Sequence, residues 1–211
     1  DDIMGVLHEE ADEDLAHMVG APDIDRETDS PIAIARLRLP WLMITMFAGL
    51  LNSLIIKQIL DVTNVVAVAI FVPAIMAMSG NTGIQSAAVA IRGIALGYKA
   101  YDRLRQIVTR EIVVGVIMGL ICGCLTGTIV WLALSMTGVD TGGLNPAYLA
   151  TAVGLAMSNA MIFASCYGSV VPVLLHRLGV DPAVASGPFV TTSNDLSASL
   201  IYFLTCIIIL R

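Results

Sequence analysis

Long stretches of this chain carry no charged side chain, and they constrain the fold more than any other feature. Four runs lack Asp, Glu, Lys and Arg entirely, at 39–56, 62–91, 112–139 and 141–175. A fifth run, 182–210, contains a single charge, Asp195. A helix that crosses a bilayer needs roughly 20 predominantly apolar residues. The sequence therefore predicts five transmembrane helices, at 39–60, 63–91, 106–136, 147–176 and 184–210.

Composition supports a membrane protein. The chain is 57% hydrophobic and 13% charged, whereas ordinary soluble domains carry about 25% charged residues. A soluble protein with so few charges would lack the polar surface that keeps it in solution. We therefore expect an all-α, polytopic, multi-pass protein of the cell membrane (the inner or plasma membrane), surrounded by lipid and without a nucleic-acid partner.

The cationic residues gather on one side of the predicted spans. The positive-inside rule places segments rich in Lys and Arg in the cytoplasm. With a cytoplasmic N-terminus, the inner segments hold nine of the eleven: Arg26, Arg36, Arg38, Arg92, Lys99, Arg103, Arg105, Arg110 and Arg177. The C-terminus is then expected outside, which agrees with an odd number of spans.

The N-terminal residues 1–35 are predicted to form an acidic segment that precedes a membrane domain at 36–211. The stretch "HEEADEDLAHM" favours an amphipathic helix with carboxylates that pair at four-residue spacing. These carboxylates belong to Glu9, Glu10, Glu13 and Asp14. One interpretation is a solvated acidic helix. The other is an element that responds to cations, because hard divalent ions bind clustered carboxylate oxygens.

The second predicted span contains the polar stretch "MSGNTGIQSA". On a helix, a stripe along one face would be formed by Asn81, Gln85, Ala88 and Arg92. The stripe either makes interhelical hydrogen bonds or lines a pore. Gly80 and Gly83 beside it either admit another helix closely or loosen the helix locally, and Pro73 predicts a kink.

The last span places a carboxylate deep in the predicted membrane. Thr191, Asp195 and Ser199 follow one another at four-residue steps, and the same stretch holds two further polar residues, Thr192 and Asn194. A charge at that depth costs about 2.5–3.5 kcal/mol on insertion scales and marks ion paths. The alternative is a buried ion pair, but no Lys, Arg or His lies deep in the other four spans. A bound cation would serve as the missing partner.

The residue types around Asp195 favour a hard cation that keeps its water. Mg²⁺ dehydrates reluctantly, so hydroxyl, amide and carbonyl oxygens can hold it through its hydration shell. No His lies deep in the predicted spans, and they offer no paired Cys, for zinc or copper, whereas calcium and manganese stay open. If two chains paired about a two-fold axis, two Asp195 carboxylates would face one divalent ion.

At these residues the chain resembles the membrane domain of the MgtE family of magnesium channels, relatives of solute carrier family 41. The stretches that carry the resemblance are "HEEADEDLAHM", "RLPWLMI", "VPAIMAMSGNTGIQSAAVAIRGIALG" and "LGVDPAVASGPFVTTSNDLSASLIYF". The resemblance implies a homodimer with a pore at its axis, lined mainly by spans two and five. It also implies that Asp195 holds hydrated Mg²⁺ and that Asn81 faces the ion path near the cytoplasm.

The resemblance further implies regulation by Mg²⁺ itself. The acidic segment matches the family's connecting plug helix, which senses cytoplasmic Mg²⁺ and closes the pore. Family members also carry cytoplasmic CBS regulatory domains, which are expected in full-length proteins and have no counterpart in these 211 residues. The sequence is thus interpreted as either an isolated membrane domain or a short family member.

The resulting hypothesis is a Mg²⁺ channel that works down the electrochemical gradient, and not an enzyme. The pore-lining residues are expected to be Gly80, Asn81, Gln85, Thr191, Thr192, Asn194 and Ser199, with Asp195 as the metal-binding residue. The main alternative is a secondary carrier that exchanges Mg²⁺ for Na⁺ or H⁺. An intramembrane aspartyl protease would need a second deep aspartate, which the spans lack, and a membrane scaffold is the remaining alternative.

Overall fold

The computed structural model describes residues 30–63, 69–95, 101–137, 141, 143–180, 182 and 187–210. Within these ranges the long elements are all helices, which confirms the predicted all-α class. They are α2 (Pro31–Thr63), α4 (Val72–Ala95), α5 (Tyr101–Thr137), α6 (Pro146–Arg177) and α8 (Pro188–Leu210). The acidic residues Glu9, Glu10, Glu13 and Asp14 lie outside the described residues.

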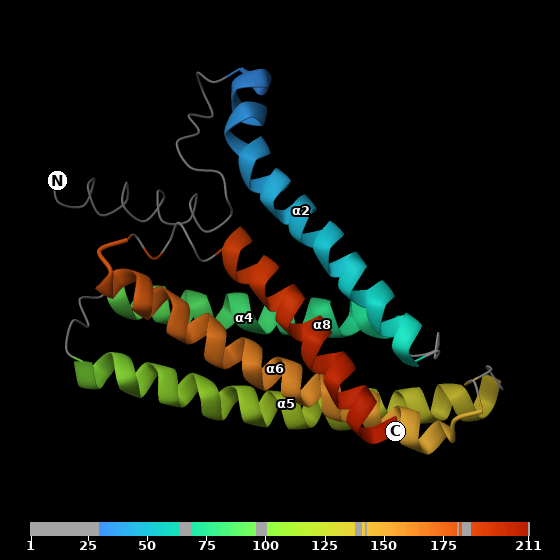
Figure 1. The fold of residues 1–211 in the computed structure, drawn as a ribbon. Helices are drawn as coiled ribbons and strands as arrows, with labels where there is room; N and C mark the ends of the chain where they lie inside the picture. The colour runs from blue at the N-terminus through green and yellow to red at the C-terminus, as the bar shows by residue number, and fades with distance from the viewer. Residues whose placement is uncertain are drawn as a thin grey trace, which may run out of the picture.

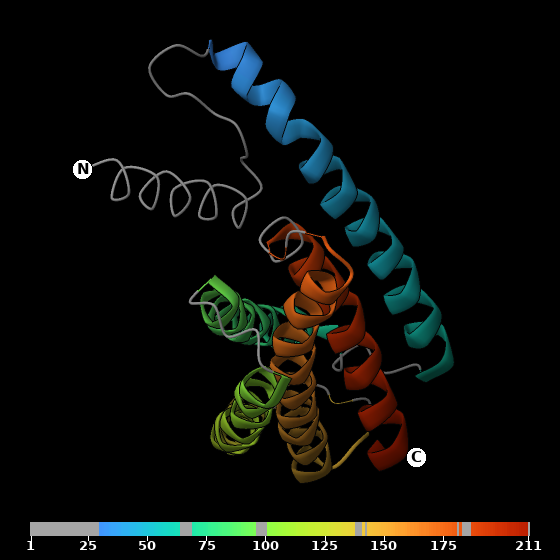
Figure 2. The ribbon, with the colours of Figure 1, turned by 90° about the vertical axis from the view of Figure 1, so that its left-hand side faces the viewer.

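Helix α6 is the centre of the bundle. It packs on α5, α4 and α8, and α4 also packs on α8. Helix α2 contacts α8, and both views place it at the opposite edge of the molecule from α5 (Figures 1 and 2). A shared apolar core joins α4, α5, α6 and α8, and it includes Met157 and Met161 of α6 and Tyr202 and Phe203 of α8. Helix α8 therefore contacts both α2 and α4.

Local chemistry sets the two ends of α6. Asn145 caps the first turn by accepting a hydrogen bond from the Ala147 N–H at 2.9 Å, and Pro146 occupies the first position, where its missing N–H costs nothing. At the other end, Gly179 adopts φ +74°, a left-handed conformation that glycine accepts readily. The observed bounds differ by one residue at each end from the predicted 147–176.

Helix α2 begins earlier than the predicted span and is bent. The Ser30 hydroxyl accepts a hydrogen bond from the Ala33 N–H at 3.3 Å, so a Ser-Pro start signal opens the helix before residue 39. The segments Pro31–Pro40 and Leu42–Lys57 meet at 41°. Pro40 explains the bend, because it donates no backbone hydrogen bond and its ring collides with the preceding turn.

Pro73 lies at the start of helix α4. Helix α4 starts at Val72, which puts Pro73 in its first turn, where backbone N–H groups have no partner within the helix. A turn at residues 70 and 71 separates this helix from the helical residue Ala69, and residues 64–68 lie outside the described ones, so the predicted kink stays a prediction. Of the second predicted span, 63–91, the residues from Val72 onward belong to α4, which runs on to Ala95.

Three described helices are long and apolar enough to cross a membrane. They comprise Arg105–Thr137, Pro146–Arg177 and Phe189–Leu210, and the two arms of α2 together would make a fourth. Helix α4 is not among them, since polar side chains interrupt its middle, including Asn81 and Gln85. The predicted five spans, their orientation and the homodimer accordingly stay predictions.

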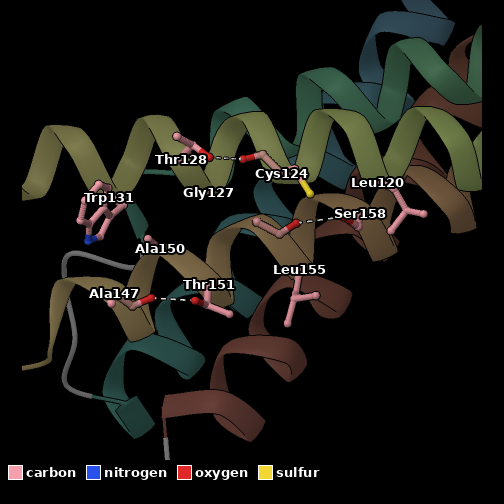
Figure 3. A pocket seen from close by; sticks show the side chains of 12 residues that line it. Leu120, Cys124, Gly127, Thr128, Trp131, Ala147, Ala150, Thr151, Leu155 and Ser158 are labelled. Carbon is pink, nitrogen blue, oxygen red and sulfur yellow. Dashed lines mark hydrogen bonds between the residues drawn. The ribbon is translucent and has the colours of Figure 1, made fainter.

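Helices α5 and α6 meet through a row of glycines on α5. Gly115, Gly119, Gly123 and Gly127 follow at four-residue steps, and a Cβ at Gly119 would lie only 2.8 Å from the Ser158 carbonyl oxygen. The Ser158 hydroxyl donates to the Gly119 carbonyl at 2.8 Å. Beside this contact lies a largely apolar pocket of about 580 Å³, in which Figure 3 shows Trp131 and Leu155 from the two helices. Small residues thus allow the two backbones to approach closely.

Ser165 links three helices, and its loss should destabilise the bundle. Its hydroxyl donates to the Glu111 carbonyl of α5 at 2.7 Å and lies 2.9 Å from the Ser86 hydroxyl of α4. We expect Ser165→Ala to lower the free energy of unfolding by about 1 kcal/mol, measured by denaturant titration in detergent micelles. Thr128→Ala is the control, because Thr128 bonds only within its own helix. Equal unfolding free energies for the two variants would contradict the expectation.

Candidate functional site

Asp195 lies where α8 passes close to α4. The two helices approach at Gly80, where an added Cβ would lie 3.5 Å from Asp195 Oδ1 and 4.0 Å from Thr191 Cγ2. At Gly83, an added Cβ would overlap the Asn194 side chain. Gly80 and Gly83 were expected either to admit another helix closely or to loosen their own helix, and the structure shows the close approach of α8. The glycines thereby seat the polar stretch of α8 directly against α4.

The Asp195 side chain lines a small cavity that three helices enclose. Its volume is about 100 Å³, which has room for a few water molecules. Helix α8 contributes Thr191, Thr192 and Asp195, and the other two helices contribute Thr45, Ala48, Gly49, Asn52 and Met76. The cavity therefore combines one carboxylate with hydroxyl, amide and thioether groups.

The hydroxyl oxygens of Thr45 and Thr191 can accept hydrogen bonds at this cavity. Thr45 donates its hydroxyl hydrogen to the Leu42 carbonyl at 2.8 Å, and Thr191 donates to the Gly187 carbonyl at 2.9 Å. A hydroxyl has one hydrogen and two lone pairs, so each oxygen keeps lone pairs for a ligand. Together with the Asp195 carboxylate, they suit a ligand that is positively charged or brings its own hydrogen-bond donors.

No positive side chain neutralises Asp195 in the described part of the chain. The carboxylate is half-buried, and no Lys, Arg or His of the described residues forms an ion pair with it. The described residues also contain no group of three or more His, Cys, Asp or Glu side chains that could hold a metal ion directly. A divalent ion at Asp195 would therefore keep most of its water, as Mg²⁺ does.

The remaining predicted site residues do not line this cavity. Ser199 is buried, and its hydroxyl donates to the Asp195 carbonyl at 3.0 Å. Asn194 is 1% exposed against Gly83, and neither polar atom of its amide has a hydrogen-bond partner. Asn81 and Gln85 lie exposed on α4 and do not line the cavity. Within a single chain, Asp195 is thus joined by Thr191, Thr192 and Gly80, but not by the polar stripe of α4.

Sequence reasoning missed the contribution of α2. Asn52 is 4% exposed, and its Nδ2 donates to Met76 Sδ of α4 at 3.3 Å, while its Oδ1 has no partner. A signal was present, because Asn52 is an isolated amide in the charge-free run 39–56. A polar group inside an apolar span needs a partner, and here the partner belongs to another helix.

Comparison with known proteins places these residues in a family. Residues 72–205 match the family model MgtE, described as a divalent cation transporter. The chain belongs to the MgtE family. The match begins at the first residue of α4 and includes all of α6, and it contains Gly80 and Asp195. Helix α2, with Asn52, lies outside the matched residues.

Curated MgtE proteins are similar to this chain over nearly all of its length. "Magnesium transporter MgtE" of Bacillus subtilis is 36% identical over 207 residues, and its namesake from Enterococcus faecalis is 34% identical over 204 residues. The protein of that name from Thermus thermophilus is 35% identical over 207 residues. Each alignment covers 96% of this chain and 43% of the relative. The chain therefore spans less than half the length of the relatives it matches.

Proposed function

We propose that this protein transports Mg²⁺ across the cell membrane, passively and down the electrochemical gradient. The observation that carries the proposal is the Asp195 carboxylate, which lines a cavity with acceptor oxygens and lacks an ion-pair partner among the described residues. The names of the relatives support Mg²⁺ as the transported ion. Hydrated Mg²⁺ supplies the positive charge and the hydrogen-bond donors that the cavity lacks.

In this proposal, the conducting unit is a homodimer with the pore at its axis. Asn81 and Gln85 support the idea, since they are exposed on α4 of the single chain in a stretch predicted to lie in the membrane, where exposure to lipid would be costly. A second copy would cover them and bring two Asp195 carboxylates towards one divalent ion, which would balance its charge. Asn194 and Ser199 then support the pore wall from behind.

Cytoplasmic Mg²⁺ would regulate the pore through the acidic segment. Mg²⁺ bound to Glu9, Glu10, Glu13 and Asp14 would relieve the repulsion between their carboxylates and draw the segment together, closing the pore. At low Mg²⁺ the repulsion returns and the path opens. The CBS domains of longer relatives would strengthen this response.

Flux measurements in liposomes test the proposal. The membrane potential contributes about 2.3 kcal/mol per charge per 100 mV, so an inside-negative potential should drive Mg²⁺ entry without a gradient of any other ion. We expect protein-dependent filling of a trapped Mg²⁺ indicator that grows with the potential. Uptake that requires a Na⁺ or H⁺ gradient would establish the exchange carrier instead, and a folded protein without Mg²⁺ uptake would overturn the proposal.

A further inference from the structure

Asn52 is the buried polar side chain at the cavity whose hydrogen bonding is incomplete. It comes from α2, which contacts α8, and its side chain is 4% exposed. Its Oδ1 has no hydrogen-bond partner. Leaving a buried acceptor without a hydrogen bond is unfavourable, so a ligand that donates a hydrogen bond to this oxygen would stabilise the site.

Met76 fixes which way the Asn52 amide faces. A thioether sulfur accepts hydrogen bonds and has no hydrogen to donate. The amide NH₂ group can therefore bond Met76 Sδ, at the observed 3.3 Å, whereas the flipped amide would set an oxygen lone pair against the sulfur. The donor side of Asn52 is thus occupied by α4, and its acceptor side is the one left without a hydrogen-bond partner.

Asn52 completes a set of acceptors drawn from two helices. Thr45 stands two helical turns before it on α2, and Thr191 and Asp195 belong to α8. The hydrogens of the two threonine hydroxyls are bound within their own helices. A cavity of about 100 Å³ with this lining attracts water molecules whose hydrogens point outward, which is how water is oriented around a cation.

We propose that Asn52 is a positioning residue for the transported cation, with its amide oxygen accepting a hydrogen bond from the hydration shell of an ion at Asp195. Met76 holds the amide in the orientation this requires. The inference rests on the proposed function and extends it, because it assigns a part of the ion site to α2. Helix α2 would then pack against α8 and also help to select an ion that retains its water.

Concentration-dependent flux in liposomes tests the inference through Asn52→Leu, which keeps the size of the side chain but removes its polar atoms. A hydrogen bond in a charged setting is worth about 1.5–3 kcal/mol, so we expect the half-saturating Mg²⁺ concentration to rise about tenfold or more. Asn52→Asp loses the hydrogen bond to Met76 but restores the acceptor with a negative charge, whose attraction to the cation should return that concentration to the wild-type value or below. A purely structural role would not be rescued by an added charge.

Two methionine variants provide an independent arm should Asn52→Leu fold poorly. Met76→Leu removes the acceptor that orients Asn52, and we expect about a threefold rise in half-saturating Mg²⁺, on the order of a few tenths of a kcal/mol to 1 kcal/mol. Met78→Leu, the same change at an exposed position of α4, should leave it unchanged. A wild-type value for folded Asn52→Leu would overturn the inference, and where that variant does not fold, a wild-type value for Met76→Leu would do so.

The same experiment separates this inference from the proposed function. If the wild type carries Mg²⁺ and Asn52→Leu carries it with unaltered half-saturation, then the proposed function stands and the role of Asn52 fails. If the folded wild type carries no Mg²⁺ at all, then the proposed function fails and the inference with it.

Discussion

Replacing Asp195 by asparagine is expected to abolish Mg²⁺ transport while leaving the fold intact. The amide has the same shape as the carboxylate but carries no charge. A divalent ion held through one water lies roughly 5 Å from the carboxylate, where their attraction amounts to several kcal/mol at an effective dielectric constant of about 20. Because about 1.4 kcal/mol corresponds to a factor of ten, Mg²⁺ flux should fall at least about 100-fold.

Growth of cells that lack their own Mg²⁺ uptake gives the sensitive measurement. Wild-type protein should restore growth at low external Mg²⁺, and Asp195→Asn should not, at equal amounts in the membrane. The matched control is Glu111→Gln, which removes a charge from a partly buried residue of α5 that lies outside the cavity. Full rescue by Asp195→Asn would remove the carboxylate from the transport mechanism.

Asp195 could be found from the sequence because its position is anomalous within one segment. The run 182–210 contains a single carboxylate and no other charge. Because placing a charge in a membrane is costly, this residue could be singled out as functional without knowledge of its neighbours. Thr191 and Thr192 followed from helical spacing alone, and the structure places both at the cavity with Asp195. Periodicity within one helix was sufficient for these residues.

The contribution of α2 depends on packing between helices that are distant in sequence. Asn52 and Asp195 come together because α2 lies against α8, and no pattern within either helix specifies that contact. The role of the glycine row on α5 could not be predicted for the same reason, because its partner Ser158 belongs to α6. An isolated amide or a small residue indicates that a neighbour exists, but which helix supplies it is a property of the whole bundle.

Some helix boundaries could be predicted from the sequence and others could not. Both ends of α6 depend on local signals, a cap at Asn145 and a left-handed Gly179, and were predicted to within one residue. The start of α4 was not, since apolar character continues across the residues before Val72 and only the first-turn geometry of Pro73 marks the beginning of the helix. Hydropathy locates a span, whereas backbone chemistry decides where its helix starts.

The second large effect is expected at Gly123, on the contact between α5 and α6. A Cβ added there would overlap the Ser158 hydroxyl and lie 2.5 Å from the Gly154 carbonyl oxygen, a distance that real Cβ atoms do not adopt. The carbonyl is backbone and cannot rotate away, so α5 must move off α6. Gly123→Leu should also break the Ser158 hydrogen bond to the Gly119 carbonyl, which is 2.8 Å long.

Gly123→Leu is expected to lower the free energy of unfolding substantially. Leucine improves helix propensity over glycine by less than about 1 kcal/mol, whereas overpacking costs about 1–3 kcal/mol or more and the lost hydrogen bond about 1 kcal/mol. We expect a net loss of roughly 3 kcal/mol, measured as the free energy of unfolding in micelles. Gly123→Ala should lie between the wild type and Gly123→Leu, because the first added carbon already meets the backbone.

Ala133→Leu is the control for added bulk on the same helix, since Ala133 is exposed and a larger side chain there has space. It should unfold like the wild type. Comparable stability of Gly123→Leu and Ala133→Leu would mean that α5 and α6 are not in backbone contact. Because α6 also supports α4 and α8, a shift at this contact would displace both helices that meet at Asp195, so Mg²⁺ flux should fall together with stability.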